Sequence, residues 1–220
     1  MLDIVDPPPT SLPDRRTAEL FIKAYFVFAN FHLPLLHQPS FDQKLDLVYG
    51  SMNNPHEDGQ DTDIAIFFVN MVFTLGLLIL QKREPSKFPT LLGDRYYRTA
   101  VNALQKSQIP EGIEGIQALV LMAQYAYLHP VNFGGWNMIG LALRRAVELD
   151  LHKESTDEDM DTLALDLRRR AFWVAYSLDR NIAITLGRPT FLSDGAITAR
   201  LTTLYSTLAR LTMNVFQRLV

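Results

Sequence analysis

Arginines, aspartates and aromatic residues lie close together between Asp166 and Asp194, in the stretch DLRRRAFWVAYSLDRNIAITLGRPTFLSD. Its three consecutive arginines, residues 168–170, are of the type that binds nucleic-acid phosphates. The adjacent Asp179 and Arg180 combine an acid with a cation, as charge clusters at active sites do. The stretch is therefore a phosphate-binding face, a catalytic charge cluster, or part of the frame of a helical domain.

Phosphate binding by this stretch is disfavoured. Successive residues of a helix point about 100° apart, so three adjacent arginines cannot form one phosphate-facing stripe. The chain carries a net charge of −3, whereas a surface that grips a nucleic acid usually shows a basic excess. Asp166, Asp179 and the acidic segment 152–161 would also repel a phosphate backbone.

Catalysis and metal binding are disfavoured as well. Asp179 and Arg180 form a charge pair rather than an acid–base pair, and no serine, histidine or cysteine of the stretch stands in a nucleophile arrangement. The chain has no cysteine, which excludes disulfides and cysteine-ligated zinc. Its five histidines show no i, i+4 pair: His32, His37, His56, His129 and His152. We expect no enzyme activity, no metal and no cofactor in this chain.

The third interpretation, a helical frame, fits the pattern of the stretch. Apolar side chains fall along one side of a helix at Leu165, Phe172, Ala175, Tyr176, Ile182, Ala183 and Leu186, with Trp173 at the flank. Gly187 supplies the left-handed residue at which helices commonly end, and Pro189 prevents continuation. We therefore expect a helix from Asp166 to Leu186, with Arg188 held in the turn after it.

The charges of this helix are expected to lie along the border of the core as a structural network. The predicted members are Arg169, Arg170, Asp179, Arg180 and Arg188. Asp179 requires a partner, because a buried carboxylate without one is costly. The expected partner is Arg180, Arg188 or one of the arginines at 144 and 145.

The rest of the chain predicts helices throughout, since period-3.6 patterns dominate and strand signals are weak. Ser40 with Gln43 forms a capping-box pattern for one helix start, and a residue within 61–63 is expected to cap another. Helices are expected over 14–31, from 40, over 64–80, 92–107, 113–129, 136–151 and 166–186, and from about 197 to 219. Residues 113–129 and 136–151 form a helical hairpin around a turn at 130–135.

These elements predict an all-α fold, an antiparallel helical bundle or short α-α solenoid of about eight helices. Residues 1–13, with three consecutive prolines, are expected to be a linker-like lead-in. Residues 14–220 are expected to form a single helical domain.

The segment IAIFFVNMVFTLGLLIL, residues 64–80, approaches the length of a membrane span, at about 17 uncharged residues. Asn70 and Gly76 interrupt it, and only Lys82 and Arg83 flank it as cations. A helix that is apolar on all sides is also what the centre of a large helical domain requires. We expect a buried core helix and no membrane.

Three blocks of the sequence, in order, resemble the fungal-specific transcription factor domain, the middle homology region of fungal binuclear zinc-cluster regulators. The first is Tyr25–Phe41, YFVFANFHLPLLHQPSF, and the second is Gln117–Glu154, a hairpin containing Trp136 and an "A-hydrophobic-R" pattern at Arg144. The third runs from the three arginines to Asp194 and is similar to the family pattern "R-R-R-x-W-W-x-x-Y-x-L-D-R…G-R-P". The resemblance covers about residues 14–194.

The chain departs from the family pattern at two places. Phe172 stands where the family has its first tryptophan, which keeps the aromatic character. After Ser193 and Asp194 the family usually continues with a longer loop, whereas here Gly195 leads almost directly into an apolar segment, so the C-terminal part is expected to be shortened.

The resemblance implies a regulatory region, not a DNA-binding one, of a nuclear transcription factor that controls transcription by RNA polymerase II. The resemblance implies protein partners or an apolar small-molecule effector, and contact with DNA only through a zinc-cluster domain upstream. From the acidic balance and the missing cysteines we expect a monomer or weak dimer. The motif residues that it implies are Trp136, Arg144, Arg169, Arg170, Trp173, Asp179, Arg180, Gly187, Arg188 and Pro189. The alternative is a helical interaction or scaffold module of the same fold without a transcriptional role.

Overall fold

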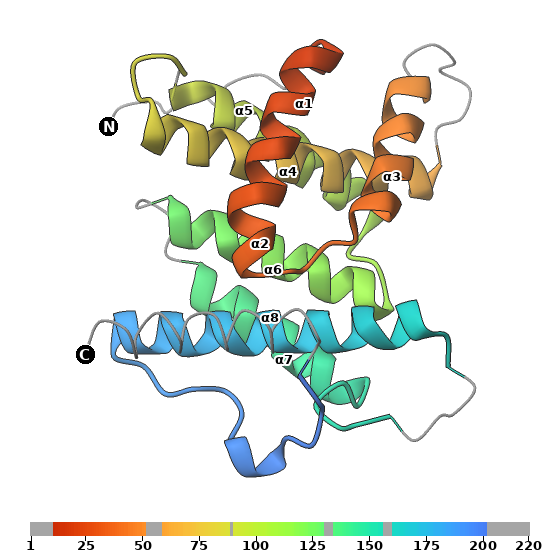
Figure 1. Ribbon diagram of the computed structural model, residues 1–220, viewed down its shortest axis with the longest axis vertical. Coiled ribbons are helices and arrows are strands. Elements are labelled where there is room, and N and C mark those ends of the chain that lie inside the picture. The colour runs from red at the N-terminus through yellow and green to blue at the C-terminus, as the bar shows by residue number, and fades with distance from the viewer. Residues whose placement is uncertain (1–10, 52–58, 89, 130–133, 156–159, 202–220) are drawn as a thin grey trace, which may run out of the picture. The chain divides into compact units, whose positions relative to one another are not determined.

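The computed structural model of the chain describes residues 11–51, 59–88, 90–129, 134–155 and 160–201. These residues are helical or lie in turns and loops, with no strand among them (Figure 1). They form two compact units, one from Met1–Phe31 and Leu36–Pro110, the other from His32–Leu35 and Glu111–Val220. The prediction of an all-α fold is confirmed, and the described part holds seven helices of ten or more residues where about eight were expected.

The first unit is built around one long helix. Its elements are α1 (Arg15–Ala24), the π-helical turn η1 (Tyr25–Ala29), α2 (Asn30–His32), α3 (Gln38–Ser51), α4 (Gln60–Arg83) and α5 (Thr90–Ser107). Helix α4 packs against α1, α3 and α5, and Figure 1 shows α1 lying across it. Every residue from Phe67 to Leu78 is buried.

By length and composition alone α4 could cross a membrane, yet 78% of its apolar 18-residue window is buried inside the protein. Burial on all sides explains why the sequence of this helix shows no polar face. The predicted core helix is therefore what the structure contains at residues 64–80.

Helix α1 begins where the sequence predicts, because Asp14 caps it by accepting a hydrogen bond from the Thr17 amide at 3.1 Å. The helix predicted over 14–31 is confirmed as a continuous helical stretch to His32, but its middle is not an α-helix. A wider π turn at Tyr25–Ala29 adds a residue and rotates the next part of the chain by roughly 100°. Phe28 and Phe31, within and after this turn, are 37% and 49% exposed.

Two helices begin earlier than their sequences indicate. Helix α3 begins at Gln38, and the Ser40 hydroxyl lies 2.9 Å from Nδ1 of His37 inside the first turn, so the predicted capping box is wrong. Helix α4 begins at Gln60 after a glycine, which places the expected caps at 61–63 in its first turn. Acidic residues there still favour the positive end of the helix.

The second unit holds α6 (Gly112–Leu128), α7 (Gly135–Glu148), α8 (Thr162–Leu186) and a short 3₁₀ turn, η2 (Asp194–Ala196). These three helices pack against one another, and every residue of α6 from Gly115 to Tyr125 is buried. The predicted hairpin of α6 and α7 is confirmed, although α7 ends three residues before residue 151. Its turn at 130–133 lies outside the described residues.

Helix α8 begins four residues before the predicted start, because Asp161 caps it by accepting from the amides of Leu163 and Ala164. It ends as predicted at Gly187, whose φ of 62° is left-handed. Of the helix predicted from about 197 to 219, residues 197–201 are not helical, and the remainder lies outside the described residues.

One close contact fixes how α1 crosses α4. A Cβ atom added to Gly76 would lie only 2.1 Å from the carbonyl oxygen of Phe21, so the two backbones touch there. The ring of Phe21 then packs edge-on against Phe73 and Tyr96, each with centroids 6.1 Å away. Only a glycine at position 76 permits this approach.

We expect Gly76→Ala to destabilise the protein by about 3 kcal/mol, because backbone rather than a side chain must move to make room. Gly93→Ala is the matched control in the same unit. Its Cβ would meet only the Leu78 side chain at 3.8 Å, and alanine favours a helix by about 1 kcal/mol. Urea denaturation measures both variants, and equal midpoints would show that α1 does not depend on this contact.

Candidate functional site

Four side chains of α8 form a stripe along one side of the helix: Arg169, Trp173, Tyr176 and Arg180. Their spacing of four, three and four residues places them on a common face. Residues 188–200, here named the return segment, come after α8 and run back along it (Figure 1). Each member of the stripe binds the return segment, or a residue that holds it.

Arg180 binds the beginning of the return segment. Its Nη1 lies 3.1 Å from Oδ2 of Asp179, and its Nη2 donates to the Leu192 carbonyl and, at 2.7 Å, to Oδ1 of Asp194. The Tyr176 hydroxyl donates to the same Asp194 oxygen at 2.7 Å, and the guanidinium lies 4.3 Å from the Tyr176 ring centroid. One arginine thus joins the helix to two residues of the segment.

Asp179 is the buried member of this cluster, with a side chain only 1% exposed. Besides Arg180, its Oδ2 accepts a hydrogen bond from the Phe191 amide at 3.0 Å. Of the partners that the sequence suggests, the structure thus supplies Arg180. A buried carboxylate needs hydrogen-bond donors, and the return segment supplies one of them through the Phe191 amide. In return, Asp179 holds the segment at Phe191.

The other end of the return segment is held by Arg169 and Trp173. Arg169 forms an ion pair with Oε1 of Glu154, whose Oε2 accepts from the Arg200 amide at 2.7 Å. The Trp173 indole donates to the Arg200 carbonyl at 2.9 Å. Burial raises the pKa of Glu154, but the Arg200 amide and the Arg169 guanidinium outweigh burial and hold that pKa below its ordinary value.

Backbone contacts complete this end. The amides of Thr198 and Ala199 donate to the His152 carbonyl at 3.0 and 3.1 Å, and the Glu154 amide donates to the Thr198 hydroxyl at 3.1 Å. The residues just after α7 and the last residues of the return segment therefore lie side by side.

The remaining motif residues take other roles. Arg170 pairs with Asp166, one turn earlier on α8, at 2.6 Å. Arg188, expected in the charge network, instead lies over the Trp136 ring at 4.7 Å from its centroid. Arg144 lies 5.5 Å from the centroid of the Phe191 ring. Gly187 ends the helix, and Pro189 lines a hollow beside it.

Sequence reasoning missed Glu154, Asp194 and Arg200 as partners of the stripe. The spacing of the four stripe residues was the available signal, since it predicts one face with donors that need acceptors nearby. The acceptors could not be identified, because they lie 14 or more residues away from the donors that they meet at Arg169 and Arg180.

A hollow of about 530 Å³ lies between the first turns of α7 and the return segment, here named the α7 hollow. Its lining is Trp136, Asn137, Gly140, Leu141, Arg144, Asp179, Pro189, Thr190 and Phe191. It brings three of the sequence-predicted motif residues of α7 and α8 together: Trp136, Arg144 and Asp179.

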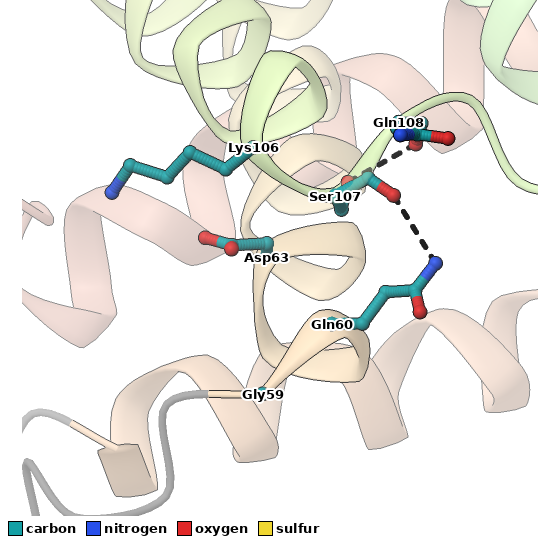
Figure 2. A pocket seen from close by; sticks show the side chains of 6 residues that line it. All are labelled: Gly59, Gln60, Asp63, Lys106, Ser107 and Gln108. Atoms are coloured by element: carbon teal, nitrogen blue, oxygen red, sulfur yellow. Dashed lines mark hydrogen bonds between the residues drawn. The ribbon is translucent and has the colours of Figure 1, made fainter.

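A second hollow, of about 590 Å³, lies in the first unit, where the start of α4 meets the end of α5 (Figure 2). The Gln60 side-chain amide donates to the Ser107 carbonyl at 3.1 Å, and the Ser107 hydroxyl donates to the Gln108 carbonyl at 3.1 Å. Asp63 and Lys106 contribute one charge of each sign to the lining. We interpret this hollow as a structural junction between two helix ends.

The charged groups of the two hollows are few and are those named above. Within the described ranges of the chain, no three histidine, aspartate or glutamate side chains come close enough together to hold a metal ion. The buried carboxylate Asp179 already accepts from a guanidinium and an amide. The arrangement is suited to binding and to holding a segment in place.

The chain is similar to a family of known proteins over most of its length. The sequence model of the family described as "Fungal specific transcription factor domain" matches residues 22–204. The positive regulator of purine utilization of Emericella nidulans is 27% identical over 85% of this chain and 22% of its own length. Pyrimidine pathway regulatory protein 1 of Saccharomyces cerevisiae is 26% identical over 87% of this chain and 28% of its own length.

A further similar protein, the negative regulator of pleiotropic drug resistance STB5 of Candida glabrata, is 28% identical over 80% of this chain. The chain spans between 18% and 28% of the length of these three relatives. No solved structure matches the chain.

We expect Asp179→Ala to cost about 3–5 kcal/mol, because it leaves Arg180 and the Phe191 amide without their acceptor. Asp46→Ala is the matched control. Its pair with Arg15 has the same 3.1 Å length, but Asp46 is 75% exposed, so the loss should stay within about 1 kcal/mol. Urea denaturation measures the free energy of unfolding of both variants. Equal decreases in the two variants would mean that Asp179 does not anchor the return segment.

The stability conferred by Asp194 should depend on pH. Hydrogen bonds from Arg180 first, and from Tyr176 second, lower the pKa of Asp194 below its ordinary value of 3.8. A lowered folded-state pKa stabilises the fold above the unfolded value, and this stability is lost as pH falls through the folded value. The difference in melting temperature between wild type and Asp194→Asn should hold from about pH 7 to 5 and shrink below about pH 4.

Thermal melts between these pH values measure that difference. Tyr176→Phe removes one of the two donors and should give a smaller difference with the same pH dependence. A difference that stays constant down to about pH 3 would show that the Asp194 carboxylate is not bonded to Arg180 in solution.

Proposed function

The chain belongs to the family of the fungal specific transcription factor domain, and we propose that it is the regulatory region of a fungal transcription regulator. The observation that carries this proposal is the family match over residues 22–204, which extends over most of each of the two units. The family consists of transcription regulators rather than enzymes, and the similar proteins are named as regulators. We propose that the protein acts in the nucleus on transcription by RNA polymerase II.

The arginines of α8 support a role that is separate from DNA contact. Arg168 donates to the Leu149 carbonyl at 3.2 Å, and the next two arginines pair with Glu154 and Asp166. Arginine side chains that already make these intramolecular contacts are not available to bind the phosphates of a nucleic acid. With a net charge of −3 and no cysteine in the chain, we propose that a separate zinc-cluster domain of the complete protein supplies DNA binding.

The return segment is the element best suited to regulation. Most of its residues are exposed, and it is held by a few polar contacts rather than by a buried apolar side. Segments held in this way open at lower free energy than packed helices do. We propose that a protein partner or a small-molecule effector acts by strengthening or releasing this attachment.

The test is a reporter gene in yeast, driven by a heterologous DNA-binding domain joined to an activation domain. We expect insertion of the 220-residue chain between the two to lower reporter output, compared with a flexible Gly/Ser linker of equal length. Asp179→Ala should restore part of the output, because it weakens the attachment of the return segment. The chain alone should show no tight, sequence-specific binding to DNA in a gel shift at low salt.

Output equal to that of the linker control would contradict a regulatory role. If the inserted chain also dimerised in that case, the result would favour the alternative of a scaffold module. Tight binding of the isolated chain to DNA would contradict the separation of the two functions.

A further inference from the structure

The walls of the α7 hollow are aromatic and incompletely covered. Trp136 comes from the first turn of α7, and Phe191 comes from the return segment. Phe191 is 38% exposed and Leu141, also in the lining, is 37% exposed. An exposed Phe191 ring and a partly buried Trp136 ring beside one hollow are typical of sites that accept a planar apolar group.

The floor of the hollow is open as well. Among the described residues, no atom lies within 4 Å of the position that a Cβ atom of Gly140 would occupy. This glycine is therefore not explained by close helix packing, in contrast to Gly76. Its missing side chain extends the hollow to the backbone of α7.

Arg144 lines the hollow, and Arg188 lies against the Trp136 ring that forms one of its walls. The guanidinium groups of Arg144 and Arg188 lie over the rings of Phe191 and Trp136. The acidic residue of the lining, Asp179, already accepts from Arg180 and from the Phe191 amide. A planar guanidinium at the rim suits a carboxylate, to which it can donate two parallel hydrogen bonds.

We propose that the α7 hollow binds a small aromatic carboxylate. Its planar body would occupy the space between Trp136 and Phe191 over Gly140, and its carboxylate would bind Arg144. The hollow, at about 530 Å³, falls within the size range of small-molecule pockets.

This ligand would act on the return segment, and in this respect the proposal rests on the proposed function. Phe191 forms a wall of the hollow, and its amide is the donor to Asp179. A ligand held against Phe191 therefore binds better when the return segment is attached to α8. Binding that prefers one of two states shifts the population toward it.

The chain contains two tryptophans, which provide a site-specific readout and an internal control. The indole N–H signals of Trp136 and Trp173 can be followed by NMR and assigned with Trp136→Phe. Titration of the 220-residue chain with 2-naphthoate should shift the Trp136 signal, with a dissociation constant of about 0.1–1 mM for a ligand of this size. The Trp173 indole, bonded to the Arg200 carbonyl, should shift much less.

Two variants and one matched ligand test the assignment. Arg144→Gln should weaken binding of 2-naphthoate at least about tenfold, because it removes a charge-assisted pair. Gly140→Met should abolish binding by filling the floor, while thermal melts check that the fold is kept. The control variant Arg95→Gln removes one positive charge from α5, in the first unit. It should bind 2-naphthoate with wild-type affinity. The neutral amide, 2-naphthamide, should bind at least about tenfold more weakly than the acid.

Equal affinity for the acid and the amide would overturn the proposal, as would wild-type affinity in Arg144→Gln or equal shifts of both indoles. So would the lack of any shift at about 10 mM ligand, well above the expected dissociation constant. The binding result is independent of the reporter assay. A ligand that binds while the reporter output stays at the linker level would leave the site standing and contradict the regulatory role alone.

Discussion

The second unit depends on one partly buried ion pair between neighbouring residues of α8. Asp179 is almost fully buried, so it requires donors, and Arg180 and the Phe191 amide are those donors. Arg180 in turn reaches Leu192 and Asp194, and thereby fixes the course of the chain after the helix. The turn at Gly187 makes this possible, because a left-handed residue is needed to bring the chain back onto the helix that it has just left.

The first unit is organised by packing rather than by charge. Its long helix α4 is buried along its middle, and α1 lies across it where a glycine removes the side chain that would separate the backbones. The two units thus use opposite means of holding a segment against a helix: an apolar close contact in one, and a stripe of donors in the other. The donor stripe is the more adjustable of the two, because its contacts are few and near water.

The helices were predictable because their apolar period is strong, and the end of α8 was predictable because glycine and proline specify it. The π turn after Ala24 was not, because no pattern in the sequence YFVFA distinguishes a π turn from an α-helix. For the site, the sequence identified the donors on α8, whose spacing is local. It did not identify Glu154 or Asp194 as acceptors, because their positions depend on how the return segment folds back. The α7 hollow depends on the same long-range arrangement.

The return segment is anchored at two places, near Asp194 and near Thr198, with only a short turn between them. Between the anchors, the Ala196 amide donates to the Ser193 carbonyl and the Ile197 amide to the Asp194 carbonyl, both at 3.1 Å, so this turn is held by local bonds rather than by α8. The entropy of closing a loop grows slowly with its length, by roughly 0.6 kcal/mol for each doubling. Related chains can therefore lengthen this connection, or insert whole segments into it, while the stripe on α8 continues to hold both ends.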